Sequence, residues 1–346
     1  MKILVDFHHN SLLRSFILLF ENRLGASVYR PVGMDWYHEG YWAINDQIET
    51  ARQFLSFETQ ILADNTPALN VVQDSRDGVY NLYDPGHKSH HKGILLESFK
   101  SQKFDYVIAS IPQHIPLFEN LIKRFQPSAK LIVQIGNNWH SSIFHGMNVM
   151  ASVKPGSIEN ANVVYYHQEF DTSIFRPKPH NVSNTVSSYI NILQNMTTGW
   201  KDFISLENLL AECNVVFKSY GGQCRDGNKA GPYEISDSMN NDDFVFHVKD
   251  HGDGYGHIIY NAYACGRPVI LRKSNYVDQL AEELINDQNS IDLDKMSHQE
   301  CAEKIRSMYL DIELMNNMSI NSYKSFINNV DFAQDAENVG KWIASI

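Results

Sequence analysis

A glycine-rich loop that runs into a short helix is the segment of this chain best suited to bind an anion. Residues 253–270 read DGYGHIIYNAYACGRPVI, in which Gly254 and Gly256 let the backbone turn tightly and approach a ligand. Apolar residues recur at helical spacing over 257–265, which predicts a helix beginning directly after the glycines. The first turn of a helix carries unpaired N–H groups and the positive end of the helix dipole. We therefore expect a phosphate or diphosphate to bind at Gly256 and His257 without a metal ion.

The residues that follow predict how this helix ends. Gly266 is placed to terminate it, and the β-rich run at 268–271 predicts a buried strand. An ordinary glycine-rich turn between a strand and a helix, as found in any α/β protein, is the alternative interpretation of the segment.

The same segment resembles the nucleotide-sugar loop of retaining glycosyltransferases with two facing Rossmann-like domains, the GT-B architecture. That family has Glu-Gly-Phe-Gly, a second Glu eight positions after the first, and then Ala-x-Ala-x-Gly-x-Pro-Val. Here Asp253 and Asn261 stand at the two acidic positions. The other matching residues are Ala262, Ala264, Gly266, Pro268 and Val269. The resemblance implies that Asp253 lies near the donor sugar. It also implies that the donor is bound by Gly254, Tyr255, Gly256 and His257.

Asn261 departs from the family pattern. The second Glu of the family resembles a clamp on a ribose hydroxyl, and Asn261 stands in its place. An amide still hydrogen-bonds a hydroxyl, but without the charge-assisted strength of a carboxylate. We therefore expect Asn261 to contact the donor as a neutral group.

A second segment is similar to the end of the first domain in the same enzymes. Residues 167–177 read HQEFDTSIFRP, and the family pattern is Asn-Gly-Val-Asp-Thr-x-x-Phe-x-Pro. Asp171, Thr172, Phe175 and Pro177 fall at the matching positions. The proline-rich run that follows cannot continue a helix or a central strand, so the segment predicts a hinge between two domains.

Departure of a diphosphate requires positive charge beside it. In the family a Gly-Arg…Lys-Gly pattern supplies two cations, and Lys201 fits the lysine, after a predicted strand and before a predicted helix. The arginine has no counterpart, because Gln194 and Asn195 occupy that neighbourhood. We expect Lys249 or Arg225 to supply the missing charge.

Polar residues follow two predicted strands in the first half of the chain. His9 and Asn10 come after the opening strand, and Asn138 and His140 come after the strand at 130–135. Open α/β sheets bind ligands outside the carboxyl ends of their strands, so we expect these residues on the acceptor side, facing the second domain. Capping of the helices that follow is the alternative, above all for Asn10.

Three histidines lie close together in a stretch rich in glycine, serine and lysine. They are His87, His90 and His91. We interpret this stretch as a mobile acceptor-binding loop rather than a zinc site.

Short apolar runs alternate with helical patterns, which predicts an α/β protein with parallel sheets flanked by helices. The expected strands are 2–7, 26–30, 104–110, 130–135, 162–166, 186–192, 214–219, 243–247 and 268–271. The expected helices are 11–23, 46–62, 116–125, 206–212, 232–240 and 257–265, and the chain beyond residue 275 is expected to be mostly helical.

The chain length favours two domains over one. At 346 residues the chain is long for one α/β core, and 43% hydrophobic content is ample for two. We expect a Rossmann-like acceptor-binding domain at 1–178 and a Rossmann-like nucleotide-sugar-binding domain at 179–330. By the resemblance, residues 331–346 form a crossover helix that packs on the first domain.

The composition limits which binding partners and which cellular location are expected. A net charge of −11 gives no general basic surface for nucleic acid. The four cysteines form no CxxC pair and the start of the chain shows no signal-peptide layout, so a reduced, cytoplasmic location is expected. The apolar stretch at 12–20 is too short to span a bilayer, so no transmembrane segment is expected.

The resemblance implies a glycosyltransferase that moves a sugar from a nucleoside-diphosphate sugar to an acceptor hydroxyl, with retention favoured over inversion. The catalytic candidates are Asp253, Lys201, Lys249 and His9, and neither a cofactor nor a metal is expected. The acceptor is a small molecule, a glycan or a modified DNA base. A nucleotide-sugar 2-epimerase and a non-catalytic sugar-nucleotide-binding subunit are the alternatives.

Overall fold

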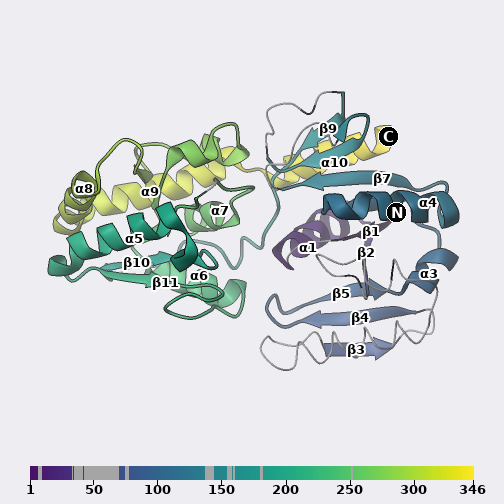
Figure 1. The fold of residues 1–346 in the computed structure, drawn as a ribbon, viewed down its shortest axis with the longest axis horizontal. Coiled ribbons are helices and arrows are strands. Elements are labelled where there is room, and N and C mark those ends of the chain that lie inside the picture. The colour runs from purple at the N-terminus through teal and green to yellow at the C-terminus, as the bar shows by residue number, and fades with distance from the viewer. Residues whose placement is uncertain are drawn as a thin grey trace. The chain divides into compact units, whose positions relative to one another are not determined.

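The protein divides into two compact units, Met1–Phe170 with Phe332–Ile346, and Asp171–Asp331 (Figure 1). The computed structural model describes residues 1–6, 10–32, 34, 42, 70–74, 78–136, 144–153, 158, 160–179, 182–250 and 252–346. The second unit begins in a turn, where the carbonyl of Asp171 accepts hydrogen bonds from the N–H groups of Ile174 and Phe175, both at 3.1 Å. Each unit is built on its own sheet.

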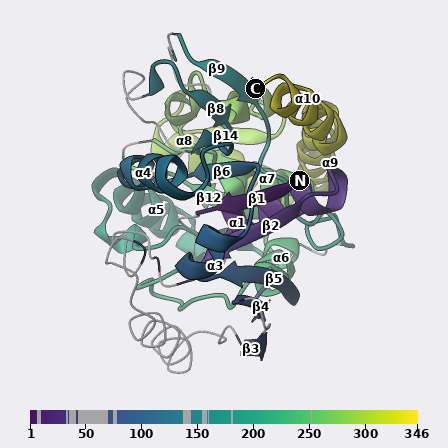
Figure 2. The ribbon, with the colours of Figure 1, turned by 90° about the vertical axis from the view of Figure 1, so that its right-hand side faces the viewer.

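The described part of the first unit contains a nine-stranded sheet in the order β3-β4-β5-β2-β1-β6-β7-β8-β9. Its strands are β1 Lys2–Val5, β2 Ser27–Pro31, β3 Asn70–Asp74, β4 Val79–Asp84, β5 Ser89–Ile94, β6 Tyr106–Ala109, β7 Lys130–Ile135, β8 Asn148–Ala151 and β9 Asn162–Tyr165. Neighbouring strands from β5 to β9 are parallel, and Leu4 of β1 lies opposite Tyr29 and Val107. Strands β3, β4 and β5 form an antiparallel edge (Figure 2).

Helices of the first unit build two apolar cores with this sheet. Their bounds are α1 Asn10–Phe16, η1 Ile17–Arg23, α3 Leu96–Ser101, η3 Pro112–His114, α4 Ile115–Phe125 and α10 Phe332–Ser345. Side chains of α3 and α4 share one core with Val107 and Val133, whereas α1, η1 and α10 share another with Ile108 and Ile132. Because successive side chains of a strand point to opposite faces, these two cores lie on opposite faces of the sheet.

The C-terminal helix α10 belongs to the first unit although it follows the second unit in sequence. Its buried residues Val339, Trp342 and Ile343 share a core with strand β1. The indole Nε1 of Trp342 donates to Asn162 Oδ1 at 3.0 Å, and a tyrosine hydroxyl of β6 donates to the carbonyl of Ile343 at 3.1 Å. The predicted return of the last helix to the first domain is confirmed.

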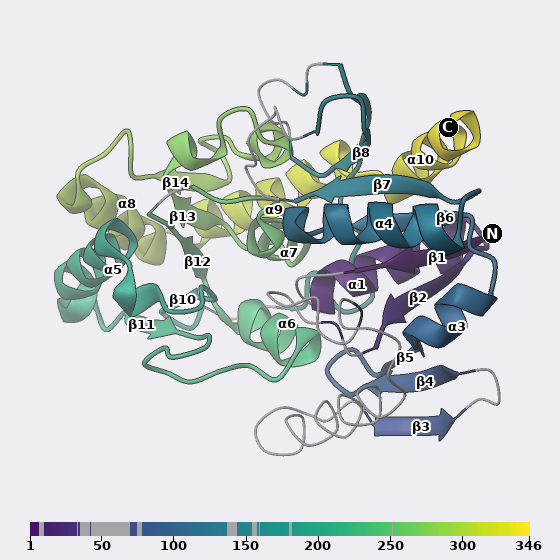
Figure 3. The same ribbon diagram turned by 45° about the vertical axis from the view of Figure 1, so that its right-hand side comes forward.

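The second unit contains a parallel sheet of five strands in the order β11-β10-β12-β13-β14 (Figure 3). The strands are β10 Thr185–Ser188, β11 Val216–Ser219, β12 Phe244–His247, β13 Val269–Leu271 and β14 Ser290–Asp292. The main helices are α5 Thr197–Leu210, α6 Pro232–Asn241, α7 His257–Ala264, α8 His298–Leu310 and α9 Ile312–Asn329. Helices α5 and α8 bury their apolar faces against Val186, Phe246 and Ile270. Among the described helices, none has the length and apolar character needed to cross a membrane.

Several elements differ from the sequence predictions. The antiparallel edge β3–β5, strand β8 and strand β14 were not predicted. Helix α5 begins at Thr197 instead of residue 206, so Lys201 lies inside the helix and not ahead of it. Its first turns contain threonine, tryptophan and the poor helix former glycine, and the carboxylate of Asp250 caps the start. The helix predicted at 46–62 lies outside the described residues.

The interpretation of the histidine-rich stretch as a loop is wrong for His90 and His91, whereas His87 lies in the turn between β4 and β5. His90 and His91 lie in β5, which pairs with β4 and β2, and the buried His91 Nε2 accepts from Arg30 Nε at 3.2 Å. Burial, with the charge of Arg30, lowers the pKa of His91 to about 3, so its ring is a neutral acceptor. Nδ1 of His87 lies 2.8 Å from Asp84 Oδ2. The sequence suggested a loop because these histidines are polar. Their hydrogen-bond partners lie on other strands, and a local pattern does not show such partners.

Candidate functional site

The glycine-rich segment follows β12, at the carboxyl edge of the parallel sheet in the second unit. Gly256 has a φ of 75°, in the left-handed region that favours glycine, and it directly precedes α7. At the other end Gly266, with a φ of 69°, terminates the helix, and its N–H donates to the carbonyl of Tyr263 at 2.9 Å. Open α/β sheets commonly bind ligands at this edge, and the N-terminus of α7 lies there.

Gly256→Ala should destabilise the protein and distort this loop. A Cβ at position 256 would lie 3.3 Å from Asp253 Oδ2 and 3.5 Å from Tyr276 Cε1, in a backbone conformation that L residues rarely adopt. We expect the free energy of unfolding, measured by urea denaturation, to fall by about 2 kcal/mol. Gly227→Ala is the matched control, because Gly227 has a φ of 83° but no atom within 4 Å of the added Cβ. Equal losses in both variants would show that crowding near Asp253 has no effect.

The Asp253 carboxylate is buried and is held from three directions. Its Oδ2 lies 2.7 Å from His247 Nε2, and its Oδ1 accepts from Lys249 Nζ at 2.6 Å and from the N–H of Gly254 at 2.9 Å. Its side chain is 8% exposed. Asp253 therefore fixes the loop between β12 and α7. The sequence alone did not indicate this structural role.

Burial and neighbouring charges have opposite effects on the protonation of Asp253 and of the two side chains that contact it, His247 and Lys249. Burial opposes ionisation of Asp253, but the hydrogen bond from His247 and the charge of Lys249 hold the pKa of the carboxyl well below its usual range. Burial lowers the pKa of His247 despite the adjacent carboxylate, so its ring is neutral at pH 7. A carboxylate can only accept hydrogen bonds, which places the proton of His247 on Nε2. One negative and one positive charge remain, on Asp253 and Lys249.

Asn261 lies one turn after His257 on the same face of α7, where side chains lean toward the N-terminus of the helix. Asn261 is buried, and its Oδ1 has no hydrogen-bond partner among the described residues. A buried amide oxygen without a donor is unfavourable, so this atom is suited to accept a hydrogen bond from a ligand. Tyr255 packs differently, because its buried ring stacks on Tyr260 at 4.3 Å between centroids and so supports the loop.

The N-terminus of α5 is already occupied by a carboxylate from the same loop. Asp250 accepts from the N–H groups of Thr197 at 2.5 Å, Thr198 at 2.8 Å and Gly199 at 3.0 Å. Lys201 follows in the first turns of α5, where it is exposed, and its ammonium pairs with no described residue. The backbone donors at the start of α5 are therefore used within the protein, whereas the Lys201 ammonium is exposed to solvent.

Arg225 is engaged in a structural cluster. Its guanidinium donates to both carboxylate oxygens of Glu207, at 3.1 and 2.9 Å, to Asp226 Oδ2 at 3.3 Å and to the carbonyl of Phe217 at 2.5 Å. These contacts join the loop after β11 to α5. Arg225 would have to leave them to bind a phosphate, so Lys249 is the better candidate for the second cation.

The residues predicted on the acceptor side belong to the first unit. His9, Asn138 and His140 lie outside the described residues. Asn10 is the exposed first residue of α1, so it lies inside the helix and not ahead of it. The role of these four residues in acceptor binding stays a prediction.

His247 and Asp250 hold the glycine-rich loop, and neither was among the predicted site residues. His247 is the one polar residue in the apolar strand sequence FVFH, which is the signal that could have identified it. Asp250 carries no such signal, because the helix that it caps begins 53 residues earlier in the chain.

The chain contains one Asp-x-Asp sequence, Asp292-Leu-Asp294, a pattern that metal-dependent glycosyltransferases use to hold a diphosphate. Here Asp294 pairs with Arg272 at 3.1 Å and accepts from the N–H of Ser274 at 2.8 Å. Asp292 Oδ1 accepts from the N–H of Lys273 at 3.1 Å. Both carboxylates thus stabilise the turn after β13. The described residues contain no group of three side chains placed to hold a metal ion.

Comparison with known proteins relates this chain to others by its fold. No protein-family model matches the sequence, and no curated protein matches it significantly. The solved structure of HepE from Anabaena in complex with UDP is 14% identical, with a TM-score of 0.62 over 100% of this chain and 99% of that chain. A variant of S. aureus TarM, solved with UDP among its ligands, is 11% identical, with a TM-score of 0.65 over 99% of each chain.

Sucrose-phosphate synthase from Thermosynechococcus elongatus is also similar in structure. It is 10% identical, with a TM-score of 0.62 over 99% of this chain and 98% of that chain. The predicted fold class, a GT-B-type α/β fold with parallel sheets flanked by helices, is therefore confirmed.

Proposed function

We propose that this protein is a glycosyltransferase whose donor is a nucleoside-diphosphate sugar. One observation carries the proposal: the N-terminus of α7 lies at the carboxyl edge of the sheet, with left-handed Gly256 before it and the unpaired Oδ1 of Asn261 one turn later. Proteins with this fold support it, since HepE is solved with UDP-glucose and TarM with UDP. The same complexes favour a uridine nucleotide in the donor.

In this proposal the diphosphate binds at the start of α7, where N–H groups and the helix dipole stabilise negative charge. Asn261 Oδ1 accepts a hydrogen bond from a ribose hydroxyl. Asp253, fixed by His247 and Lys249, orients the donor sugar.

Transfer breaks the bond between the anomeric carbon and the diphosphate oxygen and forms a bond from that carbon to the acceptor oxygen. Negative charge develops on the leaving diphosphate, and the N–H groups of α7, Lys201 and Lys249 stabilise it. Retention follows if the acceptor attacks from the face that the diphosphate leaves, with the leaving phosphate taking the acceptor proton. The anomeric configuration of the product, compared by NMR with that of the donor, tests this step.

UDP should bind the protein equally well with and without EDTA. Helix N–H groups and lysine side chains supply the positive field in the proposed site, and Asp292 and Asp294 are used by the turn after β13. Isothermal titration calorimetry measures the affinity, and adding Mg²⁺ after EDTA is the control. Binding that disappears with the chelator and returns with Mg²⁺ would contradict the metal-free site. The absence of binding by any nucleoside diphosphate would contradict the proposed function itself.

A further inference from the structure

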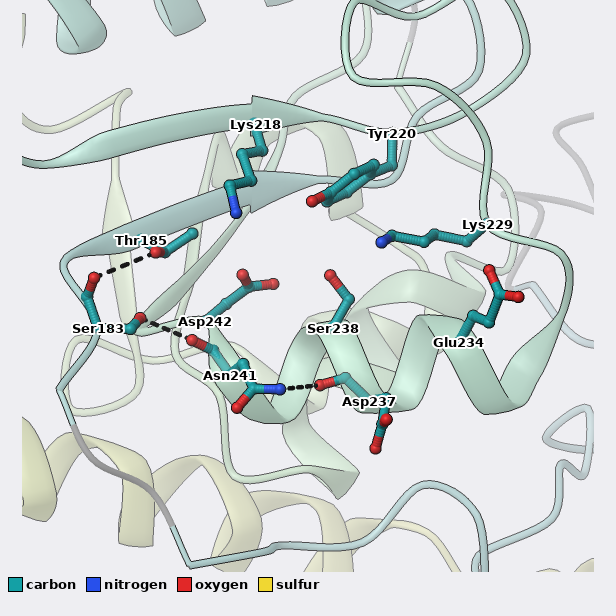
Figure 4. Close-up of a pocket in the computed structure, with 10 residues that line it drawn as sticks. All are labelled: Ser183, Thr185, Lys218, Tyr220, Lys229, Glu234, Asp237, Ser238, Asn241 and Asp242. Carbon is teal, nitrogen blue, oxygen red and sulfur yellow. Dashed lines mark hydrogen bonds between the residues drawn. The ribbon is translucent and has the colours of Figure 1, made fainter.

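A hollow of about 550 Å³ lies in the second unit between α6 and the sheet face formed by β10 and β11 (Figure 4). Residues 253–261 do not line it, so it is distinct from the glycine-rich loop. The ammonium groups of Lys218, on β11, and Lys229, ahead of α6, point into the hollow (Figure 4). The carboxyl of Asp242 and the hydroxyl of Ser238 face them from the side of α6.

The two lysines lack a carboxylate partner at ion-pair distance among the described residues, although the charge of Lys218 opposes the rise in the pKa of Asp242. Lys218 and Lys229 are half-buried, and neither forms an ion pair with a described residue. Lys229 Nζ instead lies 4.0 Å from the centroid of the Tyr220 ring, which orients it without cancelling its charge. In the same unit, by contrast, Lys178 and Lys249 have carboxylate partners at 2.6 Å.

Two further carboxylates, of Glu234 and Asp237, line the hollow and have partners of their own. Asp237 pairs with Lys178 and points away from the hollow (Figure 4). Glu234 Oε2 accepts from the N–H of Ala230 at 3.0 Å, and its side chain is exposed. Neither is within ion-pair distance of the two lysines.

Asp242 is the buried carboxyl among those that line the hollow. It accepts from the hydroxyl of Ser187 at 2.7 Å and from the hydroxyl of Tyr189 at 2.6 Å. Burial raises its pKa to about 6 despite these two hydrogen bonds. A buried carboxyl with a raised pKa that lines a hollow is a candidate functional group. Its oxygens retain lone pairs that can accept hydrogen bonds from a ligand.

We propose that this hollow binds a phosphorylated polyol of the size of a sugar phosphate. The phosphate lies between the ammonium groups of Lys218 and Lys229, because neither forms an ion pair with a described residue and both point into the hollow. The hydroxyl groups of the ligand donate to Asp242 and exchange hydrogen bonds with Ser238. The volume lies within the range of about 300–1,000 Å³ usual for ligand pockets. This site depends neither on the donor site nor on the proposed activity.

Calorimetry with glucose 6-phosphate, inorganic phosphate and glucose tests the proposal. Glucose 6-phosphate should bind the wild-type protein more tightly than phosphate, and glucose should not bind measurably. Lys218→Met and Lys229→Met should each weaken binding of glucose 6-phosphate by roughly tenfold, since each removes a charged hydrogen-bond donor. The matched control is Lys304→Met, a half-buried lysine of α8 outside the hollow, which should leave the affinity unchanged.

Ser238→Ala provides a second test that does not depend on the lysines. It should weaken glucose 6-phosphate more than inorganic phosphate, because phosphate has no sugar hydroxyls to contact position 238. The thermal midpoint of each variant shows that it is folded. The proposal is overturned if no probe binds the wild-type protein, or if folded Lys218→Met and Lys229→Met both bind glucose 6-phosphate as the wild type does. Competition between UDP and glucose 6-phosphate for one site would overturn it as well, by placing the phosphate at the donor loop.

Discussion

Asp253→Ala is expected to lower the rate of UDP release from UDP-glucose by at least about 100-fold and the free energy of unfolding by about 3 kcal/mol. The substitution removes the acceptor of the Lys249 ammonium and of the buried His247. Stability falls because the buried ring of His247 and the one-third exposed Lys249 lose their common acceptor. The rate falls because the donor sugar loses the group that orients it. Steady-state kinetics and urea denaturation measure the two effects.

Asp253→Asn separates catalysis from stability. The amide keeps the shape of the side chain and can still accept a hydrogen bond from His247, so we expect a smaller loss of stability with most of the loss of rate. Asp287→Ala is the control, since Asp287 pairs with Lys295 on the surface of the same unit. A stable Asp253→Asn protein with the wild-type rate would make Asp253 a structural residue alone.

Acid should remove the contribution of ionised Asp253 to the free energy of unfolding of the wild-type protein. The pKa of Asp253 is lower in the folded protein than in the unfolded chain. Its stabilisation is therefore complete above about pH 4 and decreases as the pH falls below that value. Between pH 4 and 2 the stability difference between wild type and Asp253→Asn should accordingly shrink.

Lys201→Met and Lys249→Met are expected to reduce kcat by about 30-fold each, which corresponds to about 2 kcal/mol of transition-state stabilisation. Lys201 is exposed on α5 without a described partner, and Lys249 donates one of its three N–H groups to Asp253. Two donors of Lys249 therefore remain for a phosphate. Rates of UDP release from UDP-glucose, together with UDP affinities, measure the effect of each substitution.

The double variant shows whether the two lysines act on one phosphate. If they do, the combined loss should be smaller than the sum of the two single losses. Lys295→Met, which removes a surface lysine paired with Asp287, is the matched control and should keep the wild-type rate. Wild-type rates in both single variants would show that these lysines do not stabilise the leaving group.

The loop and helix of the proposed donor site could be predicted from consecutive residues. Gly256 and Gly266 both adopt positive φ, and the apolar spacing between them matches the observed helix α7. These are local properties, because backbone sterics and helical periodicity act within a few positions. Strand β7 was likewise predicted with its observed ends at 130 and 135, since its run of alternating and apolar residues is typical of a strand.

The contacts of the predicted site residues could not be predicted from consecutive residues. Arg225 was a candidate for the diphosphate, but its guanidinium binds Glu207 on α5, 18 residues away in sequence. Lys201 was placed ahead of a helix, but α5 begins four residues before it, where Asp250 caps the helix from another loop. Such partners depend on which elements become neighbours in the folded sheet.

The sequence by itself determined a glycine-rich turn, the helix after it and two α/β domains, because turn conformation and apolar periodicity are encoded over short stretches. Tertiary structure alone decided that Asp253 is held by His247 and Lys249, and that Lys218, Lys229 and Asp242 surround a common hollow. The charge of each group, and therefore its chemistry, depends on its burial and on neighbours supplied by other elements of the fold.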